Sequence, residues 1–484
     1  MKLETAVKYM NAQASNLNPV LLQTEVQSFS IDSRQIRAGE VFFALSQPDY
    51  KNNCFNGDFA DSHTFITDAF GKGAAACVAR PDKFEEHKAG LEQFQDRIIF
   101  VDDAILALQN LAHGVYIEWN KPVVAITGSA GKTTAKELTA HVLQNSGRKV
   151  LRNIKNYNNG LGHPLTVLNL VKDKSFDVAV LEMGMSTPSN EIARLCRITP
   201  PDLAVELNVL PVHVEHLGSI ENVAKGKAEL VEGLKTGGTA VLNADDARVL
   251  KMRKLHKGYT ITFGIDNAAD VTASEIEMKR FGQTRFVLNL PNGAAEVSFQ
   301  LSGQHNVSNA LAAAAVGYSF GMTAQEIADA LCSVKPPAQR GEVLHFRDGF
   351  TVINDSYNSN PAALLGMVET LVDGGKSARR LVVVAGEMLE LGEKEKEIHG
   401  ETGAELAASG IDFLIGVRGL AKDLVESAKK HNLGKTKFFD DSDEAGDFLV
   451  NEIKAGDLVL VKGSRGVKTE TVIEKLLESY RLEE

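Results

Sequence analysis

This 484-residue sequence contains only four cysteines, and they are scattered along the chain. Cys54, Cys77, Cys196 and Cys332 form no CxxC pair and have no histidine partners at zinc-ligand spacing. This pattern argues against a disulfide framework and against a zinc site built on cysteine. We expect reduced, mostly buried thiols, as in a cytosolic protein.

Long apolar runs are also missing. No stretch approaches the roughly 18 consecutive apolar residues that a membrane-spanning helix needs. The opening residues, MKLETAVKYMNAQASN, lack the apolar centre of a secretory signal. We therefore expect a soluble, cytoplasmic protein without membrane insertion.

Positive charge is in deficit. Lysine and arginine number 52 against 63 aspartate and glutamate residues, a formal net charge of −11. An acidic balance argues against general nucleic-acid binding, although a local basic site still allows anionic substrates. The length and the ordinary content of hydrophobic residues (44%) and charged residues (24%) indicate about three globular domains.

Two breaks divide the chain. A helix is predicted near 104–119 and is interrupted by Lys121-Pro122, and a second boundary is marked by Pro336-Pro337. We therefore predict three α/β domains, over 1–118, 119–335 and 336–484.

The central segment has the pattern of a parallel sheet. Short apolar strands are predicted at Val123–Thr127, Asp177–Met183 and Asp202–Val209, with helical stretches between them. After the second break the alternation restarts, which predicts a second doubly wound domain. Its predicted strands are Thr351–Asp355, Arg380–Gly386, Asp412–Val417 and Asp457–Gly463.

The segment TGSAGKTT, beginning at Thr127, has the composition of a phosphate-binding loop. Gly128 and Gly131 allow backbone N–H groups to approach phosphate oxygens, and a helix N-terminus follows. Lys132 is the candidate cation for the β- and γ-phosphates, and Thr133 is the candidate Mg²⁺ ligand. We predict that this loop binds ATP.

The loop departs from the common pattern GxxxxGK[ST], because position 126 holds Ile126 where that pattern has glycine. The shortened form, GxxGKTT, weakens the case for an ordinary kinase or GTPase. The alternative is a glycine-rich strand-to-helix turn that carries a lysine by chance. The preceding strand and the following helix favour the phosphate loop.

Lys227 lies on the apolar face of a predicted helix. Ile220, Val223, Leu230 and Leu234 follow the i, i+3, i+4, i+7 stripe to which this lysine also belongs. A lysine in an apolar stripe is costly unless it is paired, modified or snorkelling. From the residues alone, snorkelling at a helix edge and chemistry near phosphate and metal both remain open.

Other polar residues stand at the ends of strands and helices. Glu182 ends an apolar strand, where a carboxylate can bind Mg²⁺ or simply be solvated. His213 closes another strand-loop unit. Asp355 ends the first strand of the third segment, and Arg340 follows the proline pair. Asn306 and Asn309 lie one turn apart on a predicted helix, where Asn306 is also a possible N-cap.

Nine segments together resemble one family. They are AITGSAGKTT from Ala125, NYNNGLGHPLTVL from Asn156, VLEMGMS from Val180, NVLPVHVEHLGSIENVAKGKAEL from Asn208, SGQHNVSNALAA from Ser302, QRGEV from Gln339, INDSYNSNP from Ile353, AGEMLELGEKEKEIHG from Ala385 and LVKGSRGVKTE from Leu460. With these segments the chain resembles the Mur ligase family of peptidoglycan synthesis over essentially its whole length. EMLELGE and KGSRG favour the member that adds D-alanyl-D-alanine to UDP-N-acetylmuramoyl-tripeptide. The Asp-Asn-Pro-Arg signature expected of the diamino-acid-adding member is absent.

The resemblance implies a fold and a reaction. It implies an N-terminal mixed α/β domain for UDP, a central parallel-sheet ATPase domain and a C-terminal Rossmann-like domain. The tripeptide carboxylate would react with ATP to an acyl phosphate, from which the amine of D-alanyl-D-alanine would displace phosphate. We expect a monomer with two Mg²⁺ ions. A different Mur-type amide ligase and a non-catalytic ATP-binding protein are the alternatives.

The resemblance also assigns residues. It implies that Lys227 is carbamylated and helps hold a second Mg²⁺, with Glu182 and His213 nearby, and that Thr133 is a further metal ligand. The implied catalytic residues are Lys132, Glu182, His213 and Lys227. The residues implied for ATP are Gly128, Ser129, Ala130, Gly131, Lys132, Thr133, Thr134, Asn306, Asn309, Arg340, Asp355, Tyr357 and Asn358. Ser33 and Arg34, in the segment IDSRQIRAGEVFFAL, are implied to lie near UDP. One departure from the family follows that segment, where a longer stretch over 46–66 carries Asp61-Ser62-His63.

Overall fold

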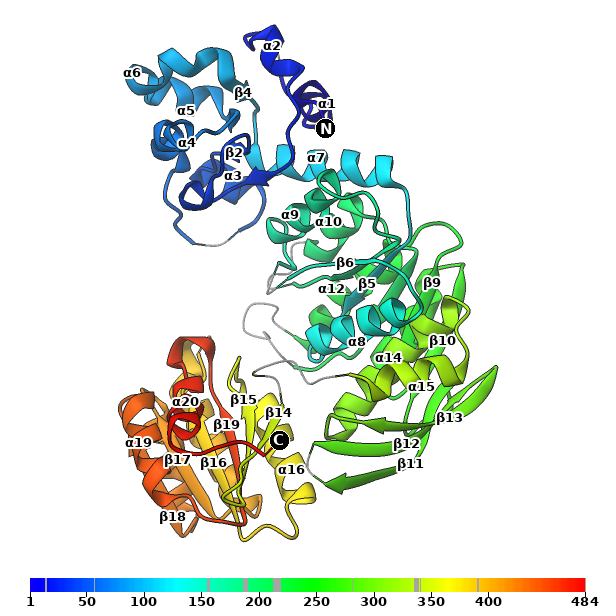
Figure 1. Ribbon diagram of the computed structural model, residues 1–484, viewed down its shortest axis with the longest axis vertical. Coiled ribbons are helices and arrows are strands. Elements are labelled where there is room, and N and C mark those ends of the chain that lie inside the picture. The colour runs from blue at the N-terminus through cyan, green and yellow to red at the C-terminus, as the bar shows by residue number, and fades with distance from the viewer. Residues whose placement is uncertain are drawn as a thin grey trace. The chain divides into compact units, whose positions relative to one another are not determined.

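The computed structural model describes residues 1–484 apart from 14, 56, 155–156, 186–189, 212–218, 281, 335–338, 340, 390 and 484. Two predicted site residues, His213 and Arg340, lie outside the described residues. The chain divides into two compact units. Figure 1 labels the helices and strands in chain order. The first unit is Met1–Val271 with Ala312–Met322, and the second is Thr272–Leu311 with Thr323–Glu484.

The first unit begins with a small parallel sheet. Its strands, in spatial order, are β1 (Phe29–Ser30), β2 (Val41–Phe43), β3 (Ala76–Ala79) and β4 (Ile98–Phe100). The helices around it are α1 (Leu3–Tyr9), α2 (Pro19–Leu22), α3 (Gln47–Asn52), α4 (Ile66–Gly71), α5 (Pro81–Glu86) and α6 (Lys88–Leu91).

Helix α7 (Ala104–Trp119) joins this sheet to the next one. It confirms the predicted helix, and it ends at Asn120, whose φ of 46° is left-handed, just before the predicted break. Leu108 of α7 belongs to one apolar core with Val78 of β3 and Val123 of the following strand. The N-terminal sheet and the phosphate-loop sheet therefore share a core.

The second sheet of this unit carries the phosphate loop. Its strands are β5 (Val123–Thr127), β6 (Val150–Arg152), β7 (Val178–Glu182), β8 (Leu203–Glu206), β9 (Thr239–Asn243) and β10 (Tyr259–Gly264). The order is β10-β9-β8-β5-β7-β6 and every pairing among these six is parallel. Because β5, β7 and β8 are buried along their whole length, their sequences are continuously apolar until the last residue.

Helices connect these parallel strands, as crossover connections require. They are α8 (Lys132–Asn145), α9 (Gly162–Val167), α10 (Glu191–Ile198), α12 (Ile220–Glu232) and α13 (Ala247–Lys251). The predicted strands at Val123–Thr127, Asp177–Met183 and Asp202–Val209 are confirmed, the last two with shorter ends.

The second unit contains an antiparallel meander that the sequence patterns above did not predict. Its strands are β11 (Val271–Arg280), β12 (Gln283–Leu290) and β13 (Gly293–Phe299). Helix α14 (Gln304–Ser319) follows it and crosses the division between the units, and α15 (Ala324–Cys332) comes next.

The remainder of the second unit is a doubly wound sheet in the order β14-β15-β19-β16-β17-β18. Its strands are β14 (Glu342–His345), β15 (Thr351–Asp355), β16 (Arg380–Gly386), β17 (Phe413–Val417), β18 (Lys435–Phe439) and β19 (Asp457–Lys462). Its helices are α16 (Pro361–Gly374), α17 (Glu395–Ala408), α18 (Ala421–Lys430), α19 (Ser442–Glu452) and α20 (Glu470–Ser479). Only the β14–β15 pair is antiparallel within this sheet of described residues.

Successive residues of these strands face opposite sides of the sheet. Val383 packs in a core with Leu406 of α17, whereas Val382 packs in a separate core with Leu449 of α19. Both faces are therefore covered by helices, and the predicted doubly wound fold is confirmed. Strands β1–β4, β5–β13 and β14–β19 fall within the three predicted domains, whose boundaries remain predictions.

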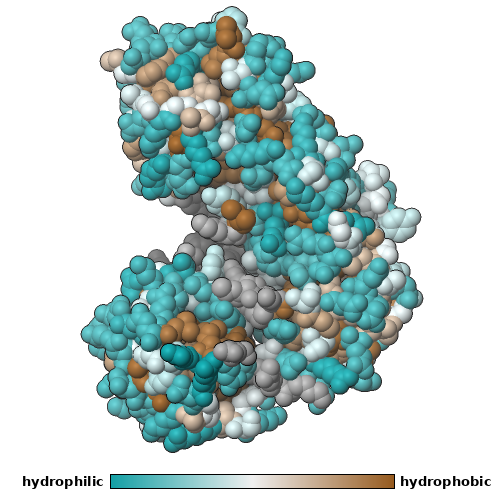
Figure 2. Space-filling model, viewed as in Figure 1, coloured by the Kyte–Doolittle hydropathy of each residue, from teal (hydrophilic) through white to brown (hydrophobic). Residues whose placement is uncertain are grey.

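The visible surface is mostly hydrophilic, with small hydrophobic spots (Figure 2). Exposed apolar side chains such as Val20 (79% exposed) and Tyr259 (75% exposed) occur singly in the sequence. Among the described residues, no helix combines the length and hydrophobicity needed to cross a bilayer.

Candidate active site

The loop between β5 and α8 has the geometry of a phosphate cradle. Gly128 and Gly131 have φ values of 158° and 82°, which favour glycine. A Cβ atom on Gly128 would lie 2.8 Å from Cβ of Leu207, so glycine is also required for space. Helix α8 begins at Lys132, immediately after the loop, and places its positive dipole end there.

Asn208 braces this loop from the neighbouring strand connection. Its Oδ1 accepts a hydrogen bond from Ala130 N (2.9 Å), and its Nδ2 donates to Ala130 O (3.1 Å). Ser129 N donates to Asn208 O (3.0 Å). Lys132 Nζ bonds the carbonyl oxygens of Gly128 (2.8 Å) and Ser129 (3.3 Å), which keeps the ammonium group over the loop.

Glu182, the last residue of β7, faces the first turn of α8. Its Oε2 accepts a 2.8 Å hydrogen bond from Thr133 Oγ1, and its Oε1 accepts a 2.7 Å bond from Asn158 Nδ2. The Glu182 side chain is only 3% exposed. A hydroxyl and a carboxylate of this kind are hard oxygen donors, which suit Mg²⁺. The structure thus joins Thr133 to Glu182, two residues that the resemblance assigns to one metal site, and Lys132 precedes Thr133 in the first turn of α8.

Lys227 is buried on α12, with 3% of its side chain exposed. Burial and, to a smaller extent, the positive charge of Lys132 lower the pKa of this lysine to about 7, against the attraction of Glu206. No hydrogen bond or ion pair to another described residue engages its Nζ. About half of the Lys227 side chains are therefore neutral, nucleophilic amines at pH 7, and the buried head group does not reach solvent as that of a snorkelling lysine would.

Glu206, the last residue of β8, is a buried carboxylate that the sequence reasoning missed. It is 0% exposed, and neither of its oxygens has a hydrogen-bond partner in the described part of the chain. Its register partner on β5 is Thr127, whose hydroxyl is likewise buried without a described partner. Burial raises the pKa of Glu206 well above its usual value, against the attraction of Lys227. The same signal that identified Glu182, a carboxylate ending an apolar strand, also applies to this residue.

The predicted UDP contacts occupy a short 3₁₀ turn in the N-terminal sheet region. Ser33 begins this turn, and its carbonyl oxygen accepts a bond from Lys72 Nζ (2.8 Å). Arg34 forms a bidentate pair with Asp32, with both N···O distances 2.9 Å, and this bonding holds the pKa of Asp32 below its usual value. The Arg34 side chain is 86% exposed.

A hollow of about 690 Å³ opens beside this turn within the first unit. Asp32 and Gln35 line it from the turn, Arg152 lines it from the end of β6, and Asn169 lines it from the 3₁₀ turn that follows α9. Ser33 and Arg34 themselves are not among its lining residues. The hollow is large enough for a nucleotide-sized ligand.

His63, in the atypical stretch, serves the fold of this region. Its side chain is buried, its Nδ1 bonds Asp61 Oδ1 (2.7 Å), and its Nε2 accepts from Arg80 N (3.2 Å). Burial lowers the pKa of His63, so the neutral ring donates to the carboxylate. Asp61 and His63 therefore satisfy each other's hydrogen-bonding groups within the fold.

In the second unit, Asp355 pairs with a lysine that the sequence reasoning left unassigned. Lys462 Nζ donates to Asp355 Oδ2 (2.6 Å) and to Asn358 O (2.9 Å). Asp355 and Lys462 are register partners at the ends of the adjacent parallel strands β15 and β19. Lys462 is 4% exposed, so Asp355 and the carbonyl of Asn358, rather than water, stabilise its charge. Tyr357 lies in the connection between β15 and α16, where its backbone N–H donates to Gln339 O (3.2 Å).

The two predicted asparagines of α14 have different surroundings. Asn306 Nδ2 donates to Ser302 O (2.8 Å), so this side chain closes the first turn of the helix. Asn309 is buried, with 5% exposed.

The segments EMLELGE and KGSRG are brought together in this unit. Leu389 N donates to Ser464 Oγ (2.9 Å), which ties one segment to the other. Met388 N donates to His399 Nε2 (3.0 Å), and His399 Nδ1 bonds Glu395 O (2.7 Å), which fixes the ring as the Nδ1–H tautomer.

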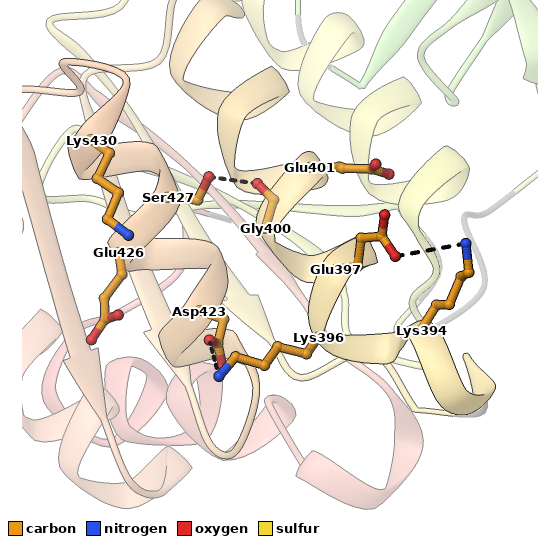
Figure 3. A pocket seen from close by; sticks show the side chains of 9 residues that line it. All are labelled: Lys394, Lys396, Glu397, Gly400, Glu401, Asp423, Glu426, Ser427 and Lys430. Atoms are coloured by element: carbon orange, nitrogen blue, oxygen red, sulfur yellow. Dashed lines mark hydrogen bonds and ion pairs between the residues drawn. The ribbon is translucent and has the colours of Figure 1, made fainter.

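A separate hollow of about 560 Å³ lies between α17 and α18 (Figure 3). Its charged groups are partly paired with each other, as in Lys396–Asp423 (3.4 Å) and Lys394–Glu397 (3.7 Å). None of the residues predicted to bind or react lines it.

Comparison with known proteins identifies the same family as the sequence motifs do. The Mur ligase middle domain matches residues 126–317, and the Mur ligase glutamate ligase domain matches residues 339–465. The UDP-N-acetylmuramoyl-tripeptide–D-alanyl-D-alanine ligase of Bacillus subtilis (strain 168) is 31% identical over 96% of this chain and 95% of its own length. The enzyme of the same name from Escherichia coli (strain K12) is 32% identical over 94% of each chain.

Solved structures agree with the sequence relatives. MurF from Acinetobacter baumannii has a TM-score of 0.83 at 27% identity and covers 99% of this chain and 98% of its own. The MurF ligase of Thermotoga maritima, solved in complex with ADP, has a TM-score of 0.79 at 29% identity and covers 96% of this chain and 99% of its own. The predicted α/β class with parallel sheets is confirmed. The chain therefore belongs to the Mur ligase family and is of its MurF type.

Proposed function

We propose that this chain is an ATP-dependent ligase that joins D-alanyl-D-alanine to UDP-N-acetylmuramoyl-tripeptide. The observation that carries the proposal is the contact between Thr133 and Glu182, beside Lys132 at the start of α8. Lys227, whose pKa is lowered to about 7, interacts electrostatically with Lys132. The names of the relatives supply the substrates, and the ADP complex of the Thermotoga protein supports ATP as the nucleotide.

The reaction needs charge neutralisation more than a side-chain nucleophile. The tripeptide carboxylate attacks the γ-phosphorus of ATP, ADP leaves, and an acyl phosphate forms. The amine of D-alanyl-D-alanine then attacks the acyl carbon, phosphate leaves, and the nitrogen loses a proton. Lys132 and the backbone N–H groups of the loop orient the phosphates and stabilise their developing charge.

In this proposal Thr133 and Glu182 would hold Mg²⁺, and carbamylated Lys227 would help hold a second ion, with Glu182 and His213 nearby. When bound, Mg²⁺ neutralises the phosphate oxygens and so lowers the cost of bringing a carboxylate to them. The buried position of Lys227 supports carbamylation, because a neutral amine is the form that reacts with carbon dioxide and burial maintains that form.

The remaining assignments are part of the proposal. Asn306, Asn309, Arg340, Asp355, Tyr357 and Asn358 contact the nucleoside of ATP, and Ser33 and Arg34 contact UDP. The 690 Å³ hollow beside Asp32 and Gln35 supports a nucleotide site there. We further propose a cytoplasmic monomer with the three domains 1–118, 119–335 and 336–484.

Release of ADP by the purified chain tests the proposal. Turnover should require both UDP-N-acetylmuramoyl-tripeptide and D-alanyl-D-alanine. Turnover with another amino acid in place of D-alanyl-D-alanine indicates a different Mur-type amide ligase. ATP binding without turnover under every substrate combination indicates a non-catalytic ATP-binding protein.

A further inference from the structure

Lys136 is a buried cation on α8 that the proposed reaction does not use. Its side chain is 1% exposed. Its Nζ donates to Asn153 O (2.6 Å) and pairs with Glu137 Oε1 (2.9 Å). A buried ammonium group is costly unless such partners hold it, and an apolar side chain would avoid this cost. The position of this lysine therefore needs an explanation beyond packing.

Asn153, the residue that Lys136 contacts, extends the pairing of β6 with β7. The backbone register of these strands ends at Arg152 opposite Val180. Beyond that point the Asn153 side chain takes over, because its Oδ1 accepts from Glu182 N (3.0 Å) and its Nδ2 donates to Glu182 O (2.9 Å). A side-chain amide thus holds the backbone of Glu182 as a neighbouring strand would.

Helix α8 consequently reaches Glu182 by two routes. Thr133 bonds the Glu182 carboxylate directly, and Lys136, three residues later on the same face, acts through Asn153 on its backbone. Arg152 takes the other oxygen of Glu137 (2.7 Å), so the lysine and its acidic neighbour also tie α8 to the end of β6.

We propose that Lys136 is a positioning residue that fixes the metal-binding end of β7 against the phosphate loop, by holding Asn153 on the Glu182 backbone. The inference rests on the proposed function, in which Glu182 and Thr133 hold Mg²⁺. Groups that orient metal ligands typically change metal affinity about 10- to 100-fold when they are removed. A lysine that only stabilised the fold would leave metal affinity unchanged in the folded variant.

The test compares full-length Lys136→Met with Lys121→Met. Lys121 is a matched control because its Nζ also bonds a backbone carbonyl, that of Phe176 (2.7 Å), in the same unit. Mn²⁺ binding is measured by electron paramagnetic resonance with a non-hydrolysable ATP analogue present, and Mg²⁺ dependence is measured by ADP release. We expect Lys136→Met to weaken Mn²⁺ binding and raise the Mg²⁺ half-saturation by about tenfold, with kcat at saturating Mg²⁺ changed less than about threefold. Lys121→Met should match the parent protein in both.

Unchanged Mn²⁺ binding in folded Lys136→Met overturns the inference. Asn153→Ala interrupts the same route and decides the matter if Lys136→Met does not fold. Its Mn²⁺ affinity should fall by a similar factor. The double variant should bind Mn²⁺ about as tightly as whichever single variant binds it less tightly, because the two residues act in series. The Mn²⁺ measurement needs no turnover. If the ligase assay fails but metal binding is present and depends on Lys136, the proposed function is contradicted and the positioning role of Lys136 is not.

Discussion

The Thr133 hydroxyl donates a 2.8 Å hydrogen bond to the carboxylate of Glu182, across the carboxyl edge of two adjacent parallel strands. This contact joins the helix that follows the phosphate loop to the end of β7. In the proposed function these two oxygen donors would hold Mg²⁺, which would offset phosphate charge.

Removal of the Thr133 hydroxyl should weaken Mg²⁺ use. Thr133→Val keeps the shape of the side chain but provides no oxygen ligand, so we expect the Mg²⁺ half-saturation of ADP release to rise by about tenfold or more. Thr133→Ser retains the hydroxyl and should stay within about threefold of the parent. Equal effects of both substitutions would contradict a ligand role.

Lys227 should give the reaction a pH dependence near neutrality. With a pKa of about 7, half of this lysine is neutral at pH 7. An unshifted lysine would be neutral in only a few molecules per ten thousand, and the neutral amine is the form that reacts with carbon dioxide. In bicarbonate buffer, ADP release should therefore rise as pH increases through about 7 and then level off.

The matched variant for that profile is Lys227→Ala. We expect it to lose more than about 100-fold in kcat. Short carboxylic acids should restore part of the activity, because they supply the missing carboxylate, and the rescued enzyme should lack the step near pH 7. Full activity of the unrescued variant would remove the carbamate from the mechanism.

Glu206→Gln should stabilise the protein at neutral pH. The pKa of Glu206 is raised in the folded state, so between its unfolded pKa of about 4.5 and its folded pKa the native state binds more protons, and stability falls as pH rises. Glutamine cannot ionise and avoids this loss. We expect a gain of more than about 1 kcal/mol in urea unfolding at pH 7 and little difference near pH 4.5. A loss at pH 7 would indicate that the carboxylate has a charged partner in the folded protein.

Lys462→Met should destabilise the second unit. The substitution leaves Asp355, 16% exposed in its side chain, without its 2.6 Å partner, and we expect a loss of about 1–3 kcal/mol in urea unfolding. Lys435→Met is the comparison, because Lys435 is 46% exposed and pairs with Glu452 at the surface. Its loss should be below about 1 kcal/mol.

The sequence predicted the features that depend on local pattern. Continuous apolar runs identified β5, β7 and β8, and helical periodicity placed Lys227 on a buried face. Glu182 was found because it ends such a strand. The resemblance assigned Thr133 and Glu182 to one metal site, and the two side chains are joined by a hydrogen bond, although their metal-binding role stays a prediction.

What the sequence did not predict depends on which strands are neighbours. Asn153 and Asn158 reach Glu182 because β6 lies beside β7, and Asn208 reaches the loop because β8 lies beside β5. No periodicity encodes that order. The β11–β13 meander was not predicted. Burial alternates along β12 and β13, but the partly exposed Val287 and the exposed Ala294 interrupt the polar and apolar alternation of the sequence.

Ligase activity is tested by ADP release from the purified chain with ATP, Mg²⁺, UDP-N-acetylmuramoyl-tripeptide and D-alanyl-D-alanine, with each component omitted in turn. We expect turnover only when all four are present, and one dipeptide joined to the tripeptide for each ADP formed. ADP release that continues without the tripeptide or without D-alanyl-D-alanine would contradict the proposed ligase function.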